Sequence, residues 1–350
     1  MSILKGKNLT VEITGESHSP EMRLKVKGFP AFEYNDKALT EFLSRRKANK
    51  NAFSTPRIEC DEPLFIGSEN NQINGDFEVV IKNSNVNSKD YSDLYGKPRP
   101  SHADYAWYLK DNSLDFSGGG RFSARLTAPY CVLGGLCKQY LEKRGIYIAS
   151  YLQAVGKVEG KSYKDKEISY GEILNLSNGF PALDKKQEML DEIENAKSKG
   201  DSVGGVIETV VYGMPVGVGD NLFEGLEGKI SSLVFSVPAV KGVEFGSGFD
   251  MAKSYGSVVN DELYLDNNRV MLKSNNNGGI NGGISNGFNL TLRVAMKPTP
   301  SISIEQNTVD LVNKKNTVIK IKGRHDACVA VRAIPCIESA VAIAILDEVL

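Results

Sequence analysis

Three consecutive glycines, Gly118 to Gly120, are the feature that most constrains this chain. Glycine loses more backbone entropy on folding than any other residue, so a fold that keeps three together needs close approach or unusual dihedral angles there. Arg121, Phe122, Ser123, Ala124 and Arg125 follow directly. Backbone amides freed by glycine, with guanidinium groups beside them, are typical of an anion-binding loop. The sequence therefore predicts an anion site here, without identifying the anion.

Composition limits the class of protein. The chain has 350 residues, of which 41% are hydrophobic, enough for a packed core. The 42 Lys and Arg residues balance 43 Asp and Glu residues, which argues against bulk nucleic-acid binding. Apolar runs such as residues 340–346 are too short to span a membrane, and residues 1–5 lack the apolar segment of a signal peptide. We expect a cytoplasmic protein that binds neither nucleic acid nor membrane.

The cysteines do not indicate a metal site. There are five, at positions 60, 131, 137, 328 and 336, and no two form a Cys-x-x-Cys pair. An odd number with this spacing favours reduced, buried thiols over zinc ligation or a disulfide framework. We therefore predict no bound metal.

Local patterns predict a mixture of strands and helices. The expected strands are residues 9–13, 76–83, 207–212 and 288–296. The expected helices are residues 36–46 with Asn35 as the N-cap, 129–143, 184–199 and a buried helix over 334–350. The polar residues 83–93 predict a loop, either a flexible surface segment or an ordered lid. Because there is no steady alternation of strand and helix, we expect a single α+β domain over residues 1–350 rather than a doubly wound sheet.

Two glycine pairs suggest an internal duplication of that domain. Gly204-Gly205 is followed by Val206 and a strand, and the loop 277–284, which repeats Gly-Gly-Ile, precedes another strand. Repeated local patterns of this kind are the usual sign of a duplicated unit.

The histidines and many arginines lie in predicted loops. The chain has three histidines, His18, His102 and His325, each close to charged or hydroxyl residues. A lone histidine is more often structural than catalytic, but charged neighbours are what tune its pKa. Arginines gather beside these segments, and most of them adjoin glycine, proline, serine or histidine: Arg45, Arg46, Arg57, Arg99, Arg121, Arg125, Arg324 and Arg332. A solvated surface explains any one of them, whereas a substrate with several negative charges explains the set.

Two further segments are ambiguous. The glycine-rich loop 275–283 matches neither a dinucleotide-binding nor a Walker pattern. The turn from Lys297 to Ser301 combines a lysine, two hydroxyl groups and two prolines, which suits a phosphate or a simple turn equally well.

Blocks of sequence along almost the whole chain resemble, in the same order, those of the chorismate synthases. The blocks are Gly15–His18, Arg45-Arg46, Ser88–Tyr91, Arg99–Tyr105, Gly118–Thr127, Pro238–Glu244, residues 275–287, Lys297–Thr299, Arg324–Asp326 and Arg332–Pro335. Any one block alone would be weak, but several blocks of five or more residues in the family's order are specific.

The resemblance implies a fold and a reaction. The fold is a β-α-β sandwich, with helices packed between antiparallel sheets, and the usual assembly is a homotetramer. In the reaction, 5-enolpyruvylshikimate 3-phosphate loses phosphate and a proton in a 1,4-anti elimination to give chorismate, the last common step toward the aromatic amino acids. The family requires reduced FMN although the reaction has no net redox change. Some members also reduce FMN with NADPH; here we expect NADPH only as an indirect reductant, acting through an external flavin reductase.

The resemblance also implies residue roles. His102 would protonate the leaving phosphate, His18 would protonate or stabilise the reduced flavin, and Asp326 would assist proton removal. The substrate would contact Arg46, Arg99 and Arg125. The FMN would contact Arg121, Phe122, Ser123, Pro238, Ala239, Gly282, Lys297, Pro298, Thr299, Pro300, Ser301 and Arg324, with its phosphate at Lys297 and Thr299.

The chain departs from the family pattern at several of these blocks. Ser19 and Ser101 stand where glycine is usual, Phe122 where serine is usual, and Leu126 where glutamate is usual. Lys47 and Ala52 replace two further arginines of the basic segment; we hypothesise that Lys50 or Arg57 compensates. The departures leave two alternatives open: a flavin-binding protein that has lost catalysis, and a phosphosugar-binding enzyme without flavin.

Overall fold

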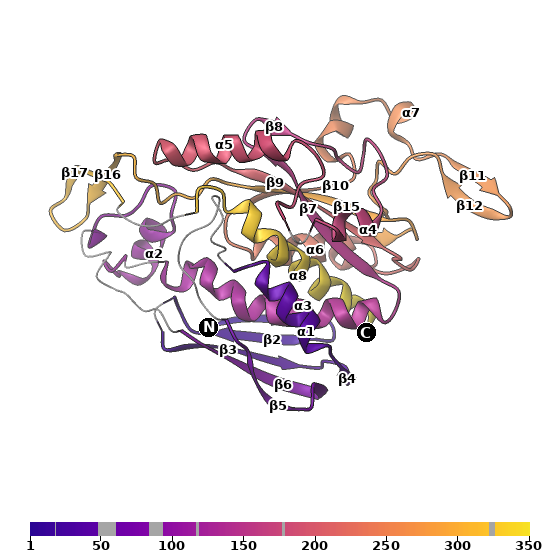
Figure 1. Ribbon diagram of the computed structural model, residues 1–350, viewed down its shortest axis with the longest axis horizontal. Coiled ribbons are helices and arrows are strands. Elements are labelled where there is room, and N and C mark those ends of the chain that lie inside the picture. The colour runs from indigo at the N-terminus through magenta and orange to yellow at the C-terminus, as the bar shows by residue number, and fades with distance from the viewer. Residues whose placement is uncertain (18, 48–60, 84–93, 117–118, 177–178, 322–325) are drawn as a thin grey trace.

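Two antiparallel sheets enclose a layer of helices (Figure 1). The computed structural model describes residues 1–350 except 18, 48–60, 84–93, 117–118, 177–178 and 322–325. The first sheet has the order β1-β2-β3-β6-β4, and β5 also pairs with β6. Its strands are β1 Ser2–Lys5, β2 Thr10–Thr14, β3 Glu21–Lys27, β4 Phe32–Glu33, β5 Leu64–Glu69 and β6 Gln72–Lys82. Along β3, Met22, Leu24 and Val26 are buried while Arg23 and Lys25 between them are exposed, the alternation expected of a sheet with one solvent-exposed face.

The second sheet is covered on both faces. Its order is β10-β15-β9-β7-β8. The strands are β7 Tyr147–Val155, β8 Val158–Glu159, β9 Gly205–Tyr212, β10 Val240–Phe245 and β15 Leu290–Met296. All of β7 after Tyr147 is buried, because inner helices cover one face while α4 (Tyr170–Leu174) and α5 (Lys186–Ser198) cover the other. A strand in a sheet covered on both sides is buried along its length rather than at alternate residues.

The middle layer contains α1 Asp36–Ser44, α3 Thr127–Glu142, α6 Leu226–Phe235 and α8 Ala330–Val349. Helix α3 contacts β3 and β6 of the first sheet, and α8 contacts β7 and β9 of the second. The two helices also pack on each other, so the core runs through all three layers. This arrangement confirms the predicted β-α-β sandwich.

Mid-helix glycines let these helices approach closely. A Cβ atom on Gly134 of α3 would lie 2.1 Å from the Cβ of Ser339 on α8. A Cβ on Gly135 would lie 2.6 Å from Leu39 of α1. Glycine weakens a helix by about 1 kcal/mol relative to alanine, so these two positions exchange helix propensity for close packing.

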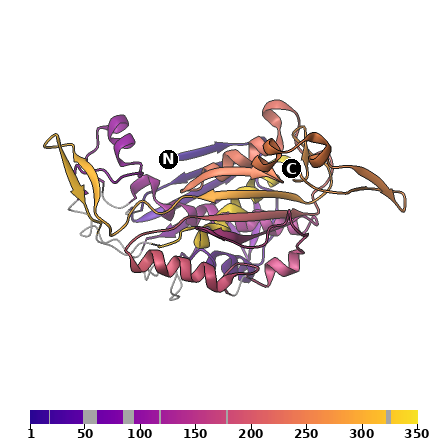
Figure 2. The same ribbon diagram turned by 90° about the horizontal axis from the view of Figure 1, so that it is seen from above.

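The remaining elements lie at the ends of the sandwich. They are α2 Asp104–Asp111, α7 Gly256–Val259, the short helices η2 Gly120–Phe122, η3 Ala124–Leu126, η4 Leu222–Glu224 and η5 Gly248–Lys253, and three hairpins: β11 Leu263–Asp266 with β12 Arg269–Leu272, β13 Ile280–Asn281 with β14 Ile284–Ser285, and β16 Gln306–Asp310 with β17 Lys315–Ile319. Figures 1 and 2 show the β11–β12 and β16–β17 hairpins projecting from opposite ends of the molecule. None of the described helices is both long and apolar enough to cross a membrane.

The eight predicted elements are present with boundaries that differ by a few residues, whereas other elements, among them β3, β7, β10 and α6, were not predicted. The first predicted helix begins at Asp36, and the Asn35 side chain accepts a hydrogen bond from the Ala38 amide, as expected of its N-cap. The last helix begins at Ala330, one turn before the predicted start, with Pro335 inside it. Because this helix is buried on nearly every side, its first turn carries no amphipathic pattern that would reveal it. Apart from Asn83, the predicted loop 83–93 lies outside the described residues.

Candidate active site

A cavity of about 810 Å³ lies where the first sheet, the C-terminal end of α6 and four connecting segments meet. The connecting segments run through Ala103, Phe122, Ala239 and Pro300. Of the predicted site residues, the cavity brings together Arg99, His102, Arg121, Phe122, Ser123, Pro238, Ala239, Lys297, Thr299, Pro300 and Ser301. These residues come from segments up to 202 positions apart, so the cavity is a product of the tertiary fold.

His102 is held by a buried carboxylate. The Asp104 Oδ1 lies 2.5 Å from His102 Nδ1, and Arg99 binds the same carboxylate through its Nε at 2.7 Å and its Nη2 at 2.8 Å. Burial alone would raise the pKa of Asp104, but the hydrogen bonds from Arg99 and His102 outweigh it and lower the pKa to about 2. An ionised Asp104 accepts a hydrogen bond from the N–H group at Nδ1 of His102. The other ring nitrogen, Nε2, is then left to exchange a proton with a ligand.

The glycine segment divides into two short helices. Gly120 has a φ of +49°, the left-handed conformation that the glycine run predicted. The side chains of Arg121 and Phe122 are exposed and line the cavity, whereas Arg125 is buried on the other side of the segment. One stretch of chain therefore presents residues to two neighbouring sites.

One end of the cavity is cationic and suits a phosphate group. Lys297 and Lys241 both line it, and Lys297 Nζ donates to the Ser101 carbonyl at 2.5 Å. Burial, followed by the charge of Lys241, lowers the pKa of Lys297. The Thr299 hydroxyl is buried without a hydrogen-bond partner among the described residues. Two close lysines and a free hydroxyl fit a phosphate, which would supply the missing acceptor and counter-charge.

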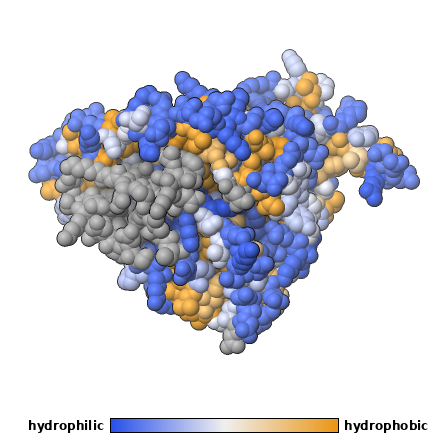
Figure 3. Space-filling view, viewed as in Figure 1, coloured by the Kyte–Doolittle hydropathy of each residue, from blue (hydrophilic) through white to orange (hydrophobic). Residues whose placement is uncertain are grey.

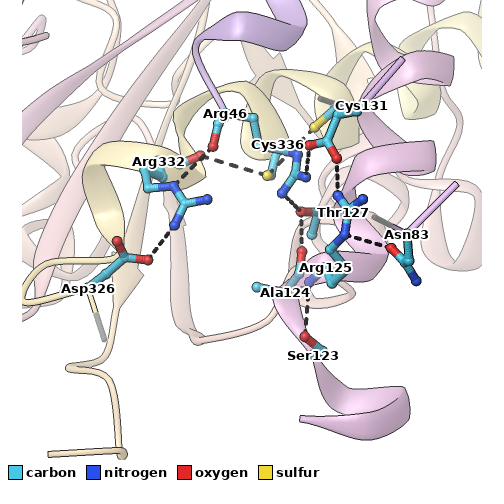
Figure 4. A network of polar contacts seen from close by, with 11 residues as sticks. Arg46, Asn83, Ser123, Ala124, Arg125, Thr127, Cys131, Asp326, Arg332 and Cys336 are labelled. Atoms are coloured by element: carbon cyan, nitrogen blue, oxygen red, sulfur yellow. Dashed lines mark hydrogen bonds and ion pairs between the residues drawn. The ribbon is translucent and has the colours of Figure 1, made fainter. Parts of the chain in front are cut away.

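Arg46 and Arg125 meet in a second cluster beside the cavity (Figure 4). The Asp61 carboxylate accepts a hydrogen bond from each guanidinium group, and Arg125 Nε donates to Asn83 Oδ1 at 3.0 Å. Both arginines are buried, and Arg46 Nη1 donates to the hydroxyl of Thr127, which lines the cavity. Asp61 and Lys241 were not predicted as site residues. Lys241 lies inside a quoted block, but nothing local in the sequence pairs Asp61 with two arginines.

Asp326 belongs to the edge of this cluster rather than to the lining of the cavity. Arg332 Nη1 donates to Asp326 Oδ2 at 2.6 Å, and Arg332 Nε donates to the Arg46 carbonyl at 3.0 Å (Figure 4). Asp326 is therefore connected to Arg46 through one intervening side chain.

The other predicted site residues lie elsewhere. Gly282 lies in the turn between β13 and β14, where the neighbouring Gly283 carbonyl accepts from the Leu226 amide at the start of α6. The cavity lies at the opposite end of α6. Within one copy of the chain, Gly282 is therefore separated from the cavity by the length of this helix. Pro298 does not line the cavity. His18, Arg324, His325, Lys50, Ala52, Arg57 and the block Ser88–Tyr91 lie outside the described residues.

The described cysteines are reduced and buried, as predicted. Cys131, Cys137, Cys328 and Cys336 are all free, and the Sγ atoms of Cys131 and Cys336 lie 3.7 Å apart beside the Arg46 cluster. Within the described part of the chain, no group of three His, Cys, Asp or Glu side chains is placed to hold a metal.

This fold and site define an α+β sandwich enzyme with a carboxylate-held histidine and two adjoining sets of cationic side chains. The sequence model of the family described as chorismate synthase matches residues 9–350. The chorismate synthases of Thermococcus kodakarensis and Pyrococcus abyssi are each 39% identical to it, over 99% of this chain and 97% of theirs. A solved structure, "Crystal Structure of Chorismate Synthase", has a TM-score of 0.76 and 26% identity, over 99% of this chain and 93% of that one. The chain belongs to the chorismate synthase family, and it is a lyase of aromatic amino acid biosynthesis whose family implies a reduced flavin cofactor.

Proposed function

We propose that this enzyme eliminates phosphate and a proton from 5-enolpyruvylshikimate 3-phosphate to form chorismate, with reduced FMN as its cofactor. The observation that carries the proposal is the position of His102. It lines a cavity whose walls also hold Arg99, Arg121 and Lys297, and Asp104 holds its ring in one orientation. A proton donor among cationic groups is what the departure of a phosphate requires.

The charge of the substrate matches the site. It carries one phosphate and two carboxylates, and of the three predicted substrate residues Arg99 lines the cavity while Arg46 and Arg125 lie in the adjoining cluster. Guanidinium groups bind such planar or tetrahedral anions through paired hydrogen bonds. Because Asp61 already neutralises part of the charge of Arg46 and Arg125, substrate groups bound there would share these two arginines with it.

His102 acts as the general acid in this proposal. With Nδ1 bound to Asp104, the protonated ring donates its Nε2 proton to the phosphate oxygen at the breaking C–O bond. Asp104 holds the ring through Nδ1, and Arg99 keeps the carboxylate in place. The role of Asp326 in proton removal remains part of the proposal, supported by its link through Arg332 to Arg46.

The described residues fit a flavin mononucleotide. Lys297, Lys241 and the unpartnered Thr299 hydroxyl would hold its phosphate, and Phe122 and Ala239 would line the space for its rings. Reduced FMN, when bound, supplies electron density to the breaking C–O bond. The protein residues bind and orient both molecules and exclude water between them. NADPH enters this proposal only as the reductant of an external flavin reductase.

A homotetramer is part of the proposal. Large apolar side chains are exposed at one end of the molecule: Leu222 is 87%, Phe223 93%, Phe249 75% and Tyr255 81% exposed. Figure 3 shows hydrophobic surface at the base of the arm that carries β11 and β12, and a hydrophilic tip. Exposed apolar surface of this extent supports contact with other copies. Reduced, buried thiols support the cytoplasmic location that we also propose.

An anaerobic assay tests the proposed function. Purified protein is mixed with dithionite-reduced FMN and 5-enolpyruvylshikimate 3-phosphate, and chorismate is measured by its absorbance and by chromatography. We expect chorismate with reduced FMN and none with oxidised FMN under the same conditions. Absence of chorismate with the reduced cofactor would refute the proposal, and light scattering of the same sample measures the oligomeric state.

A further inference from the structure

Trp107, the single tryptophan of this chain, stands directly behind the cavity wall. It lies on α2, less than two turns after His102, and is half-buried without lining the cavity. The Arg121 guanidinium lies over its ring, with Cζ 4.6 Å from the ring centroid. The Phe122 ring meets it edge-on, with centroids 5.4 Å apart and planes at 69°.

These contacts support two side chains that would otherwise be mobile. Arg121 and Phe122 are neighbours on the short helix η2, and Phe122 is 40% exposed. An exposed arginine has many rotamers, and an aromatic face reduces their number by attracting the cation. The edge-to-face contact restrains the phenyl ring in the same way.

Helix α2 is itself anchored. Its first residue, Asp104, is buried and bound by Arg99 through the backbone amide and the guanidinium group. The Trp107 ring is therefore attached to the same rigid unit that orients His102. A ligand that contacts Arg121 and Phe122 is placed relative to His102 through this one helix.

We propose that Trp107 is a positioning residue that orients Arg121 and Phe122 toward a flat, anionic aromatic ligand in the cavity. The inference rests on the proposed function, in which that ligand is FMN. The cation of Arg121 and the ring of Phe122 form one wall of the site, suited to the ring system of a flavin and to its negative charge. Trp107 acts through these two residues and does not itself touch the ligand.

Binding of oxidised FMN, followed by flavin fluorescence, tests the inference. We expect Trp107→Leu and Trp107→Met to weaken the Kd about three- to tenfold, because Arg121 loses the aromatic face that holds it. Trp107→Phe should restore the Kd to within about twofold, since it keeps an aromatic face there. Tyr105→Leu is the matched control: it removes an exposed aromatic ring from the same helix and should leave the Kd unchanged.

A double-mutant cycle separates positioning from a general loss of structure. If Trp107 acts mainly through Arg121, Trp107→Leu should cost much less affinity in an Arg121→Met background than in the wild type. Fully additive effects, or a wild-type Kd in both Trp107→Leu and Trp107→Met, would overturn the inference.

The wild-type protein supplies a second readout. Because Trp107 is the single tryptophan, its emission should be quenched as FMN binds, after correction with N-acetyltryptophanamide. Unchanged emission at saturating FMN would contradict the inference while leaving the proposed function intact. A wild-type protein that binds no FMN would refute both.

Discussion

Ser101 shows how a single residue stores strain beside the site. Its φ is +59°, in the left-handed region that favours glycine, the residue that the family pattern has at this position. The side chain is exposed, and the residue lies directly before His102. The serine therefore holds an unfavourable backbone conformation at the turn that presents the histidine.

We expect Ser101→Gly to stabilise the protein by up to about 1 kcal/mol, because glycine removes the steric cost of positive φ. The measurement is the free energy of unfolding in urea. Ser232→Gly, in the helical backbone of α6, is the control and should destabilise by a similar amount. A loss of stability in Ser101→Gly would show that the serine is not strained.

The proposed role of His102 as the general acid predicts the effect of replacing this single residue. His102→Ala should lower kcat about 10²- to 10⁴-fold with a small effect on KM, since the general acid acts mainly in the transition state. Both kinetic constants are measured from the rate of chorismate formation under anaerobic conditions, and circular dichroism is the control for folding. If kcat is unchanged, the proton donor is another group.

At the scale of elements, the contact between α3 and α8 determines the thickness of the helical layer. Gly134 lies against Ser339 of α8, and Gly135 faces α1 from the same turn. Two adjacent glycines in the middle of a helix disfavour the helix locally, yet α3 is intact over sixteen residues. Packing against its neighbours therefore overrides local propensity here.

Gly134→Ala should destabilise the protein by about 1–3 kcal/mol, because the new methyl group would overlap Ser339 and force the helices apart. Thermal and urea unfolding measure the change. The matched control is Gly171→Ala in α4, where no atom lies within 4 Å of the added Cβ. That variant should be neutral or slightly stabilising, since alanine is the better helix former. Equal effects of the two substitutions would contradict the packing argument.

At the scale of the whole molecule, one buried carboxylate joins three parts of the sandwich. Glu338 of α8 accepts from Arg45 at the end of α1, at 2.8 and 3.0 Å, from Lys138 of α3 at 2.5 Å, and from the Ser150 amide of β7 at 3.0 Å. Burial alone would raise the pKa of Glu338, but the charges of Arg45 and Lys138 outweigh it and lower the pKa to about 2. The ionised form is thus part of the folded state.

This shift predicts a specific acid dependence of stability. The unfolded chain takes up the Glu338 proton near its ordinary pKa of 4.5, and the folded protein only near 2. The contribution, about 3 kcal/mol, is therefore fully present above about pH 4.5 and is lost as the pH falls toward 2. Glu338→Gln should cost about 3–5 kcal/mol at pH 7, because Arg45 and Lys138 lose their shared counter-charge.

Urea unfolding at several pH values tests this dependence. The difference in stability between the wild type and Glu338→Gln should shrink between pH 4.5 and the lowest pH at which both still fold. Glu188→Gln, an exposed substitution on α5, should change stability little at any pH. A wild-type advantage that stays constant down to pH 2.5 would refute the assignment.

Much of the site was predictable as a set of residues, but not as an arrangement. The glycine run and its arginines predicted an anion site, and Gly120 has the expected positive φ. Asp61 was missed because its partners, Arg46 and Arg125, are 15 and 64 positions away. Gly282 was grouped with the cavity residues by resemblance, whereas the fold places it at the other end of α6.

The sequence by itself determined the α+β composition, four of the strands (β2, β6, β9 and β15), four of the helices (α1, α3, α5 and α8) and the cationic character of the site, because these depend on periodicity, capping and residue type within a few positions. Only the tertiary structure decided which charges meet, which helices touch and which aromatic ring holds Arg121. Sheet register and helix packing bring distant residues to within a few ångströms, and no local pattern encodes those distances. The glycine segment shows both the local and the tertiary contribution. The positive φ of Gly120 follows from the local sequence, whereas the division of the segment between two sites follows from the layers packed around it.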